Sequence, residues 1–286
     1  MNKPIDVQTA LITGANNGIG LALTRRLLGE GWHVAALIRS DFLEDDEEIQ
    51  AAMHKGQLRV YKADIADFAS LKQALKRIKL AEVKLDLLFN NAGGSFSELQ
   101  LTRQGRELHF DLQTVAPYAI FMELKELLKK GSYKTVVNTS TNSFKTLKKF
   151  DAQTLEHPTE FKKLFGPYST SKLALSLWTK ELAPVLAAEG LRIISVDPGG
   201  NNTIRKGKKS GLPFYITPIM KLFFPHPSKG ASLLYEAAIG KQRQAEPGTY
   251  LVNGKAGELH FTDQSAKVLN LVSSIYNREF GKSLPN

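Results

Sequence analysis

Two side chains have types and a spacing that suit proton transfer: Tyr168 and Lys172, in the segment YSTSK. On a helix, residues four apart lie on one face, one turn from each other. A free tyrosine has a pKa of about 10, which is too high for efficient proton exchange near neutral pH, and a nearby ammonium lowers it. The pair therefore predicts a tyrosine acid/base with a lysine partner. The same spacing is also common on solvated helices, so the prediction depends on the surrounding motifs.

A glycine-rich turn, TGANNGIG at residues 13–20, lies between an apolar run at 10–12 and a helical pattern. Glycine lets the backbone turn tightly and approach a pyrophosphate closely, while the amides at the next helix N-terminus face the anion. Dinucleotide binding requires this order of strand, turn and helix. The segment therefore predicts a dinucleotide site, with an ordinary strand-to-helix turn that binds no ligand as the alternative.

Arg39 lies at the end of the second strand-like run, about 20 residues beyond the glycine turn, where the adenosine ribose is read. An acidic side chain at this point would bind the 2′-hydroxyl of NAD, whereas a cation suits the 2′-phosphate of NADP. Asp41 is nearby, but the pattern puts it beyond the strand end. We therefore expect NADP(H) as the cofactor, with a solvated surface arginine as the alternative.

Short apolar runs alternate with longer helical patterns, which is typical of parallel strands joined by crossover helices. The runs are continuously apolar, as expected for a sheet covered on both faces. The sequence predicts an α/β fold: a single doubly wound Rossmann-type domain over residues 1–286, with a central, mostly parallel seven-stranded sheet flanked by helices. The strand-like runs are 9–13, 33–38, 58–62, 85–90, 135–139, 192–196 and, more weakly, 249–252, and the helix-like segments are 18–30, 67–79, 104–130, 168–189 and 228–239.

The composition excludes some kinds of chemistry. Among 286 residues there is no Cys, which excludes disulfides and a thiol nucleophile, and the six His show no metal-ligand spacing. The N-terminal residues lack the long apolar core of a signal peptide, and the apolar runs are too short to span a bilayer. We expect a cytoplasmic protein without a metal ion.

Four segments together carry a family resemblance: TGANNGIG at 13–20, NNAG at 90–93, YSTSK at 168–172 and DPGGNNT at 197–203. In the order and spacing of these segments, the chain resembles the short-chain dehydrogenases/reductases, and most of all their retinol-dehydrogenase-type members. The resemblance implies an oxidoreductase that moves hydride between a nicotinamide cofactor and a carbonyl or alcohol. It makes Tyr168 the acid/base, and it makes Lys172 both its partner and a contact of the nicotinamide ribose.

The resemblance also implies cofactor-binding roles at the matching positions, which follow the ends of successive strands. The turn around the pyrophosphate comprises Gly14, Asn16, Asn17, Gly18, Ile19 and Gly20. The positions beside the adenine and its ribose are Asp64, Ile65, Asn90, Ala92 and Gly93. The positions at the nicotinamide end are Pro198, Gly199 and Thr203.

Two positions depart from the family pattern. The family register puts Thr141 where a serine usually holds the substrate oxygen, with Ser140 directly before it. Neighbours on a strand point to opposite faces, so only one of the two hydroxyls faces the site. Gln113 stands where the family has an asparagine that helps hold a water in a proton relay to the lysine. These departures leave a second function open: an NADP(H)-binding regulatory protein with little or no turnover.

Residues 199–228 form the expected substrate lid, and residues 204–228 within it combine clustered lysines with apolar and aromatic side chains. The apolar content favours a lipophilic aldehyde, ketone or alcohol as the substrate. The same segment would also suit peripheral contact with an anionic membrane surface, or a loop packed on the core.

The formal net charge of +10 would by itself suit a nucleic-acid partner. However, the lysines cluster beside the expected substrate entrance and no recognition motif accompanies them, so we expect no nucleic acid. Family members often pair through their long helices, and the C-terminal extension at 253–286 would interfere with such pairing. Both a monomer and a homodimer therefore stay open.

Overall fold

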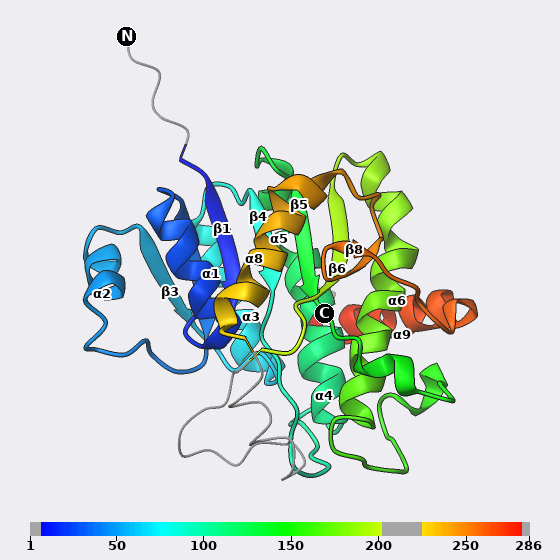
Figure 1. Ribbon diagram of the computed structural model, residues 1–286. Coiled ribbons are helices and arrows are strands. Elements are labelled where there is room, and N and C mark those ends of the chain that lie inside the picture. The colour runs from blue at the N-terminus through cyan, green and yellow to red at the C-terminus, as the bar shows by residue number, and fades with distance from the viewer. Residues whose placement is uncertain (1–6, 202–224, 282–286) are drawn as a thin grey trace.

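The computed structural model describes residues 7–201 and 225–281, which form one sheet with helices on both faces (Figure 1). Seven strands run parallel in the order β3-β2-β1-β4-β5-β6-β7, and β8 pairs antiparallel with β7. The chain order reverses between β1 and β4, which confirms the doubly wound Rossmann-type fold. The strands are β1 (Thr9–Thr13), β2 (His33–Ile38), β3 (Leu58–Lys62), β4 (Leu87–Asn90), β5 (Thr135–Thr139), β6 (Arg192–Asp197), β7 (Tyr250–Val252) and β8 (Lys255–Ala256).

The eighth strand was not predicted from the sequence. β8 follows β7 after Asn253 and Gly254, whose φ angles are +50° and +76°. Tight hairpin turns require positive φ at both central residues, and Asn-Gly is the strongest sequence signal for them. That dipeptide could have predicted the hairpin, but a strand of two residues is too short for its apolar pattern to be recognised.

Two layers of helices cover the sheet. Helices α1, α2 and α8 pack on one face, and α3, α5, α6 and α9 pack on the other. The helices are α1 (Gly18–Gly29), α2 (Glu47–His54), α3 (Phe68–Ala81), α4 (Leu108–Phe110), α5 (Ala116–Lys129), α6 (Pro167–Ala188), α8 (Pro227–Ala238) and α9 (Ser265–Phe280). A π-helical stretch (Asp111–Val115) joins α4 to α5, and the shorter 3-10 turns are Ser143–Thr146, Ala152–Thr154, Lys241–Gln244 and Thr262–Gln264.

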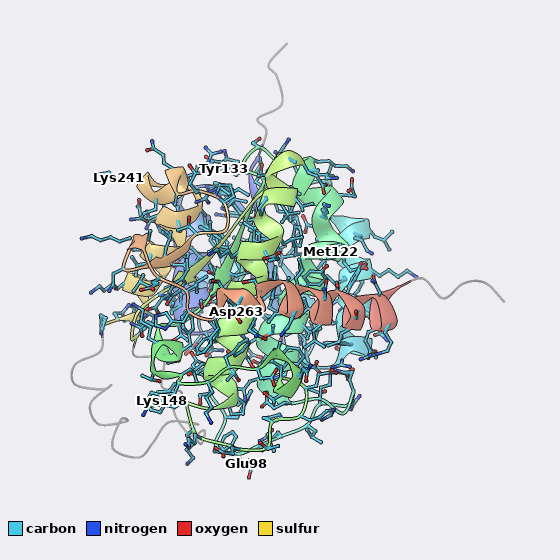
Figure 2. The ribbon with its side chains drawn as sticks, turned by 90° about the vertical axis from the view of Figure 1, so that its right-hand side faces the viewer. Glu98, Met122, Tyr133, Lys148, Lys241 and Asp263 are labelled. Carbon is cyan, nitrogen blue, oxygen red and sulfur yellow. The ribbon has the colours of Figure 1, made fainter. Side chains whose placement is uncertain are left out.

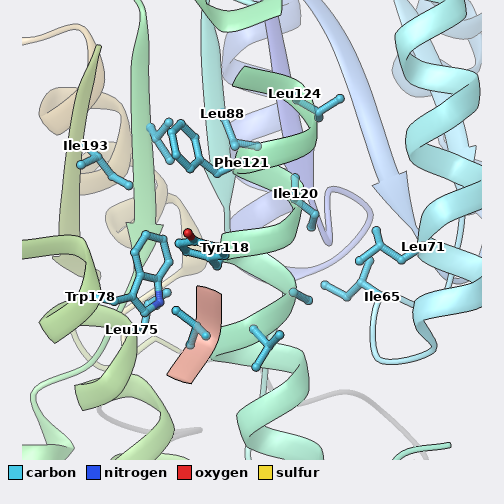
Figure 3. Close-up of a cluster of buried hydrophobic side chains, with 14 of the residues drawn as sticks. Ile65, Leu71, Leu88, Tyr118, Ile120, Phe121, Leu124, Leu175, Trp178 and Ile193 are labelled. Carbon is cyan, nitrogen blue, oxygen red and sulfur yellow. The ribbon is translucent and has the colours of Figure 1, made fainter. Parts of the chain in front are cut away.

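The strands are apolar on both sides because each side meets a helical layer. In β1 all five residues are buried; Leu11 belongs to the core on the α6 side and Ile12 to the core on the α1 side. Figure 3 shows the core on the α6 side, where Leu88 of β4 lies near Phe121 of α5, and Trp178 of α6 packs against Tyr118 of α5. Close-packed layers of this kind hold the carboxyl ends of the strands in fixed positions.

The helix α9 packs across α6 and α5, as Figure 2 shows for the segment that begins just after Asp263. The Tyr276 hydroxyl donates to Glu123 on α5 over 2.9 Å. Arg106 donates from Nη1 to Glu279 over 3.0 Å and from Nε to the buried Asp111 over 2.7 Å. Part of the C-terminal extension therefore covers α5 and α6, two of the long helices of the chain.

Nothing in residues 7–201 and 225–281 forms a helix with the length and apolar character that a membrane crossing needs. Most of the expected lid, including Thr203 and residues 204–224, lies outside the described residues. The lid and the membrane contact through 204–228 therefore stay predictions.

Candidate active site

The glycine turn has the backbone that a phosphate cradle needs. Gly14 and Gly18 have φ angles of +66° and +50°, which side chains disfavour. A Cβ at Gly20 would lie 2.2 Å from the Gly14 carbonyl oxygen, so only glycine fits there. Helix α1 begins at Gly18, and its N-cap residue Asn17 makes no side-chain capping bond. The amides of the first turn of α1 are therefore not capped by that side chain and suit an anion.

Two residues that the sequence analysis did not single out hold the turn against β4. The Thr13 hydroxyl accepts the amides of Asn91 and Ala92 over 2.9 and 2.8 Å. The Asn91 side chain donates in return to the Thr13 carbonyl over 3.0 Å. A Cβ at Gly14 would lie 3.1 Å from Ala92 Cα, so the two segments touch closely. The polar residues at the ends of β1 and β4 were the available signal for this junction.

At the adenosine end, the structure brings Arg39 and Asp64 together. Arg39 Nη1 lies 3.4 Å from Asp64 Oδ2, and the arginine side chain is 64% exposed. An exposed ion pair of this length adds little stability, so the guanidinium is free to turn toward a phosphate. Asn16 donates to the Ser40 carbonyl over 2.6 Å and thus joins the glycine turn to the end of β2. Ile65, the next residue after Asp64, is buried.

Asn90 is the last residue of β4, and Gly93 lies in the exposed loop that follows it. Asn90 is buried and donates to Asn138 of β5 over 2.8 Å. A Cβ at Gly93 would lie 2.6 Å from Gln113 Oε1, so this position also favours glycine. The NNAG segment thus joins β4 to β5 and to the helix that follows.

Tyr168 and Lys172 lie on the first turns of α6, which begins at Pro167. Lys172 is buried and donates from Nζ to the Thr139 carbonyl over 2.6 Å. Burial lowers the pKa of Lys172 to about 7. Burial also raises the pKa of Tyr168 to about 12, against a smaller opposing effect of the Thr141 hydroxyl and with an added increase from Asp197.

This raised pKa is opposite to the lowering expected from a nearby ammonium. The reason is that Lys172 is buried and Tyr168 is largely withdrawn from water, although partly accessible, which disfavours the charged form of each. Lys172 thereby loses much of the positive charge that would stabilise a phenolate. In the described chain, Tyr168 is a protonated phenol across the neutral range.

The structure separates the two hydroxyls at the end of β5. Ser140 Oγ is buried and lies 2.8 Å from Ser176 Oγ on α6. Thr141 lies on the other side: its hydroxyl interacts with Tyr168, and it accepts the Ser143 amide over 3.2 Å. The Thr141 carbonyl accepts the Tyr250 hydroxyl over 2.8 Å. Thr141 is therefore the hydroxyl next to Tyr168, and Ser140, its neighbour beyond the end of β5, is bonded to α6 instead.

Gln113 lies in the π-helical stretch between α4 and α5 and is fully buried. Its Oε1 accepts the Gly94 amide over 3.3 Å. Within the described part of the chain, its Nε2 has no hydrogen-bond partner. Gln113 thus binds the loop after β4 through its side-chain amide oxygen. Its place in a proton relay stays a prediction.

The loop after β6 carries the residues expected at the nicotinamide end. Gly199 has a φ angle of +73°, and its amide donates to Asp197 over 2.9 Å. Asn201 donates to the Pro198 carbonyl over 2.8 Å and accepts the Gly230 amide over 3.0 Å. Asn201, which the sequence analysis did not select, therefore fixes this loop to α8.

Comparison with known proteins gives the family. The model of the family described as short chain dehydrogenase matches residues 8–154. Retinol dehydrogenase 12 of Mus musculus is 30% identical over 257 residues, which cover 89% of this chain and 80% of that protein. The chain belongs to the short-chain dehydrogenase family. It is an oxidoreductase of that family and resembles retinol-dehydrogenase-type members, as the motifs predicted.

Two solved structures share the fold of this short-chain dehydrogenase. The 4-hydroxyisoleucine dehydrogenase complexed with NADH matches with a TM-score of 0.66 and 21% identity, covering 86% of this chain and 96% of the other. A blue fluorescent protein from a metagenomic library, in complex with NADPH, matches with a TM-score of 0.65 and 21% identity, covering 87% and 97%. One of these structures contains NADH and the other NADPH, so the two together do not indicate which of the two cofactors this chain binds.

A nicotinamide dinucleotide fits the residues of this short-chain dehydrogenase. In the turn at 14–20, glycine stands at Gly20, the position where a Cβ would collide with the Gly14 carbonyl oxygen. The first amides of α1 belong to the same turn. Tyr168, Lys172 and Thr141 lie at the carboxyl end of β5, across the switch point from that turn. Among the described residues, no group of His, Asp and Glu side chains is arranged to hold a metal ion.

Proposed function

We propose that this protein is an NADP(H)-dependent oxidoreductase that interconverts a lipophilic aldehyde or ketone and its alcohol. The observation that carries the proposal is the gathering of Tyr168, Lys172 and Thr141 at the carboxyl end of β5, the same edge of the parallel sheet at which the glycine turn follows β1. Arg39 at the end of β2 supports NADP(H), because a cation there suits a 2′-phosphate. The similarity to a retinol dehydrogenase, whose named substrate is lipophilic, supports the substrate class.

The bound cofactor would supply or accept the hydride, and the residues of this chain would hold it. Gly14, Gly18 and the first amides of α1 would bind the pyrophosphate, and Arg39 the 2′-phosphate. Lys172, which has donors beyond the one on the Thr139 carbonyl, would bind the nicotinamide ribose. Pro198 and Gly199 would lie at the nicotinamide end.

In the reducing direction, the protonated Tyr168 hydroxyl would give its proton to the carbonyl oxygen as the carbon receives the hydride. The Thr141 hydroxyl would donate a hydrogen bond to that oxygen and so orient the carbonyl. A developing phenolate at Tyr168 would be stabilised by Lys172 once that amine is protonated. The alcohol product would then carry the hydride on carbon and the tyrosine proton on oxygen.

The test combines cofactor binding with turnover. We expect reduced-nicotinamide fluorescence to show tighter binding of NADPH than of NADH, and Arg39→Glu to remove that preference. Tyr168→Phe should abolish reduction of lipophilic aldehydes and ketones while leaving NADPH binding within about twofold. A Tyr168→Phe variant that keeps the wild-type rate would disprove the mechanism.

A second function, an NADP(H)-binding regulatory protein with little turnover, is favoured by one observation. Gln113 uses its amide oxygen on Gly94, where the family has a relay asparagine. On this account the parent protein binds NADPH and reduces no carbonyl in a broad panel. The double variant Gln113→Asn/Thr141→Ser should then gain activity, and the absence of any gain would count against this function.

The predicted partners follow from the same proposal. We propose a lipophilic small molecule as the substrate and no nucleic acid. Peripheral membrane contact through 204–228 is proposed from the sequence alone. Because α9 covers α5 and α6, we propose a monomer rather than a dimer paired through those helices.

A further inference from the structure

A buried histidine lies beside Tyr168 and has no place in the mechanism above. His109 of α4 is 1% exposed, and its ring centroid lies 6.1 Å from that of Tyr168, edge to face at 80°. The Phe96 ring lies 4.8 Å from His109 on the loop after β4. The Phe161 ring lies 6.4 Å from it on the segment before α6. His109 is thus the centre of an aromatic cluster drawn from four parts of the chain.

Both nitrogens of His109 are used, and together they fix its proton. Nδ1 lies 2.6 Å from Oε1 of Glu107, which is fully buried, and Nε2 accepts the Phe96 amide over 3.1 Å. An acceptor at Nε2 means that the proton sits on Nδ1, where it is donated to the carboxylate. Glu107 also accepts the Phe110 amide over 2.8 Å, which fixes the carboxylate.

The loop after β4 is therefore held at two points from one helical segment. Gln113 accepts the Gly94 amide, and His109, four residues earlier, accepts the Phe96 amide. Two acceptors one turn apart fix the backbone of the loop and the direction of the Phe96 side chain. Phe96 and Phe161 are only partly buried, so the cluster around His109 reaches the surface of the described chain.

We propose that His109, oriented by Glu107, is a positioning residue that anchors the loop after β4 and builds an aromatic wall beside Tyr168. The wall selects carbonyl compounds in which the C=O is attached to a flat unsaturated group. Aromatic surfaces favour such a group over a saturated ring of the same size because they pack face to edge or in offset stacks. The substrate part of this inference rests on the proposed function; the anchoring part does not.

The anchoring is tested by hydrogen exchange of the cofactor-free, full-length protein over residues 91–100. His109→Phe keeps a ring but removes the acceptor, and we expect exchange at the Phe96 amide to rise about tenfold or more. His109→Gln keeps an acceptor and should retain most of the protection. His260→Gln, at a histidine whose side chain is 46% exposed, is the matched control and should not change it.

Because His109→Phe leaves the Glu107 carboxylate buried without the imidazole, the double variant Glu107→Gln/His109→Phe is measured as well. It should show the same faster exchange as the single variant. Unchanged exchange at Phe96 in both variants overturns the anchoring. Faster exchange across the whole chain, rather than over 91–100, overturns it too, since that result shows general destabilisation.

The wall is tested with acetophenone and its saturated analogue, cyclohexyl methyl ketone, using NADPH and the wild-type holoenzyme. We expect a lower KM for acetophenone, and Phe96→Leu should reduce this preference about two- to twelvefold while kcat and the NADPH Kd change little. Equal KM values for the two ketones in wild type overturn the wall. Binding of NADPH without reduction of any carbonyl contradicts the proposed function and the wall together, whereas the exchange data still decide the anchoring.

Discussion

The ammonium nitrogen of Lys172 lies 2.6 Å from the main-chain oxygen of Thr139, a bond that joins α6 to the last residue of β5. Thr141, two residues further on, carries the hydroxyl that interacts with Tyr168. One lysine therefore fixes the helix that carries the tyrosine to the end of the strand from which the threonine segment leaves. The relative position of the two hydroxyls depends on a side chain that is removed from water.

The buried lysine predicts a pH-dependent stability. Burial lowers the pKa of Lys172 from 10.5 to about 7, so the unfolded chain binds more protons than the folded chain between these values. Stability therefore rises with pH across that window, by about 2–3 kcal/mol from about pH 6 to about pH 9. We expect Lys172→Met to remove this part of the rise, as measured by urea unfolding at several pH values.

The control for this experiment is Lys180→Met, which changes an exposed lysine on the same helix. It should keep the pH dependence of the parent protein. If Lys172→Met and the parent show parallel curves of unfolding free energy against pH, the lysine is not the group that titrates.

The cradle predicts that Gly20 tolerates no side chain. A Cβ there would lie 2.2 Å from the Gly14 carbonyl oxygen and 2.6 Å from Asn91 Nδ2. We expect Gly20→Ala to displace the turn, weaken NADPH binding at least about tenfold and lower the free energy of unfolding by about 1–3 kcal/mol. Gly29→Ala, on the same helix with open space around the position, should bind NADPH like the parent. Equal binding by both variants would contradict the role of the turn.

The two neighbouring hydroxyls should differ in what they control. Thr141→Ala is expected to lower kcat by about a hundredfold with little change in NADPH Kd, because a donor to the substrate oxygen is lost. Thr141→Ser should recover most of the rate. Ser140→Ala removes the bond to Ser176 and should lower stability by about 1 kcal/mol with kcat within about threefold. The reverse pattern would show that Ser140 holds the substrate.

The attachment of α9 gives a fourth prediction. Arg106 is 4% exposed in its side chain and bonds to both Asp111 and Glu279. Glu279→Gln should lower the free energy of unfolding by about 1–2 kcal/mol because a buried guanidinium loses one of its two charged partners. Arg278→Gln, at a side chain that is 60% exposed, should change it by less than about 0.5 kcal/mol. Chemical denaturation measures the free energy of unfolding of both variants. Equal decreases in the two would contradict a larger contribution from the buried Arg106–Glu279 pair than from an exposed arginine.

The strands and the cradle were predictable because their causes are local. Continuous apolar runs reflect a sheet covered on both faces, and Gly14, Gly18 and Gly20 follow a strand in the sequence itself. The choice between Ser140 and Thr141 was not predictable, because it depends on which face of β5 meets α6. The raised pKa of Tyr168 was also missed, since burial cannot be read from the spacing of Tyr168 and Lys172.

Contacts between distant segments were the least predictable part of the candidate site. The bonds of Gln113 and His109 to the loop after β4 depend on the depth at which α4 and the π-helical stretch lie in the core. Asn201 accepts a hydrogen bond from the Gly230 amide of α8, and the separation of these two residues in the sequence does not indicate that they meet. In each case the residue type permitted a hydrogen bond, but only the fold supplied its partner.

The bonds between Thr13 and the Asn91 and Ala92 amides have a consequence for the order of folding. They span 78 and 79 residues of chain, and β1 lies in the sheet between β2 and β4. The first strand and its turn therefore cannot reach their final structure with only the residues next to them in the sequence. The bonds from Thr13 require the segment after β4, which the ribosome synthesises much later. Ordering such a distant contact is slow compared with forming a helix. A nascent chain should thus acquire nucleotide affinity only after β4 has emerged, so the dinucleotide can stabilise the finished sheet but cannot nucleate it.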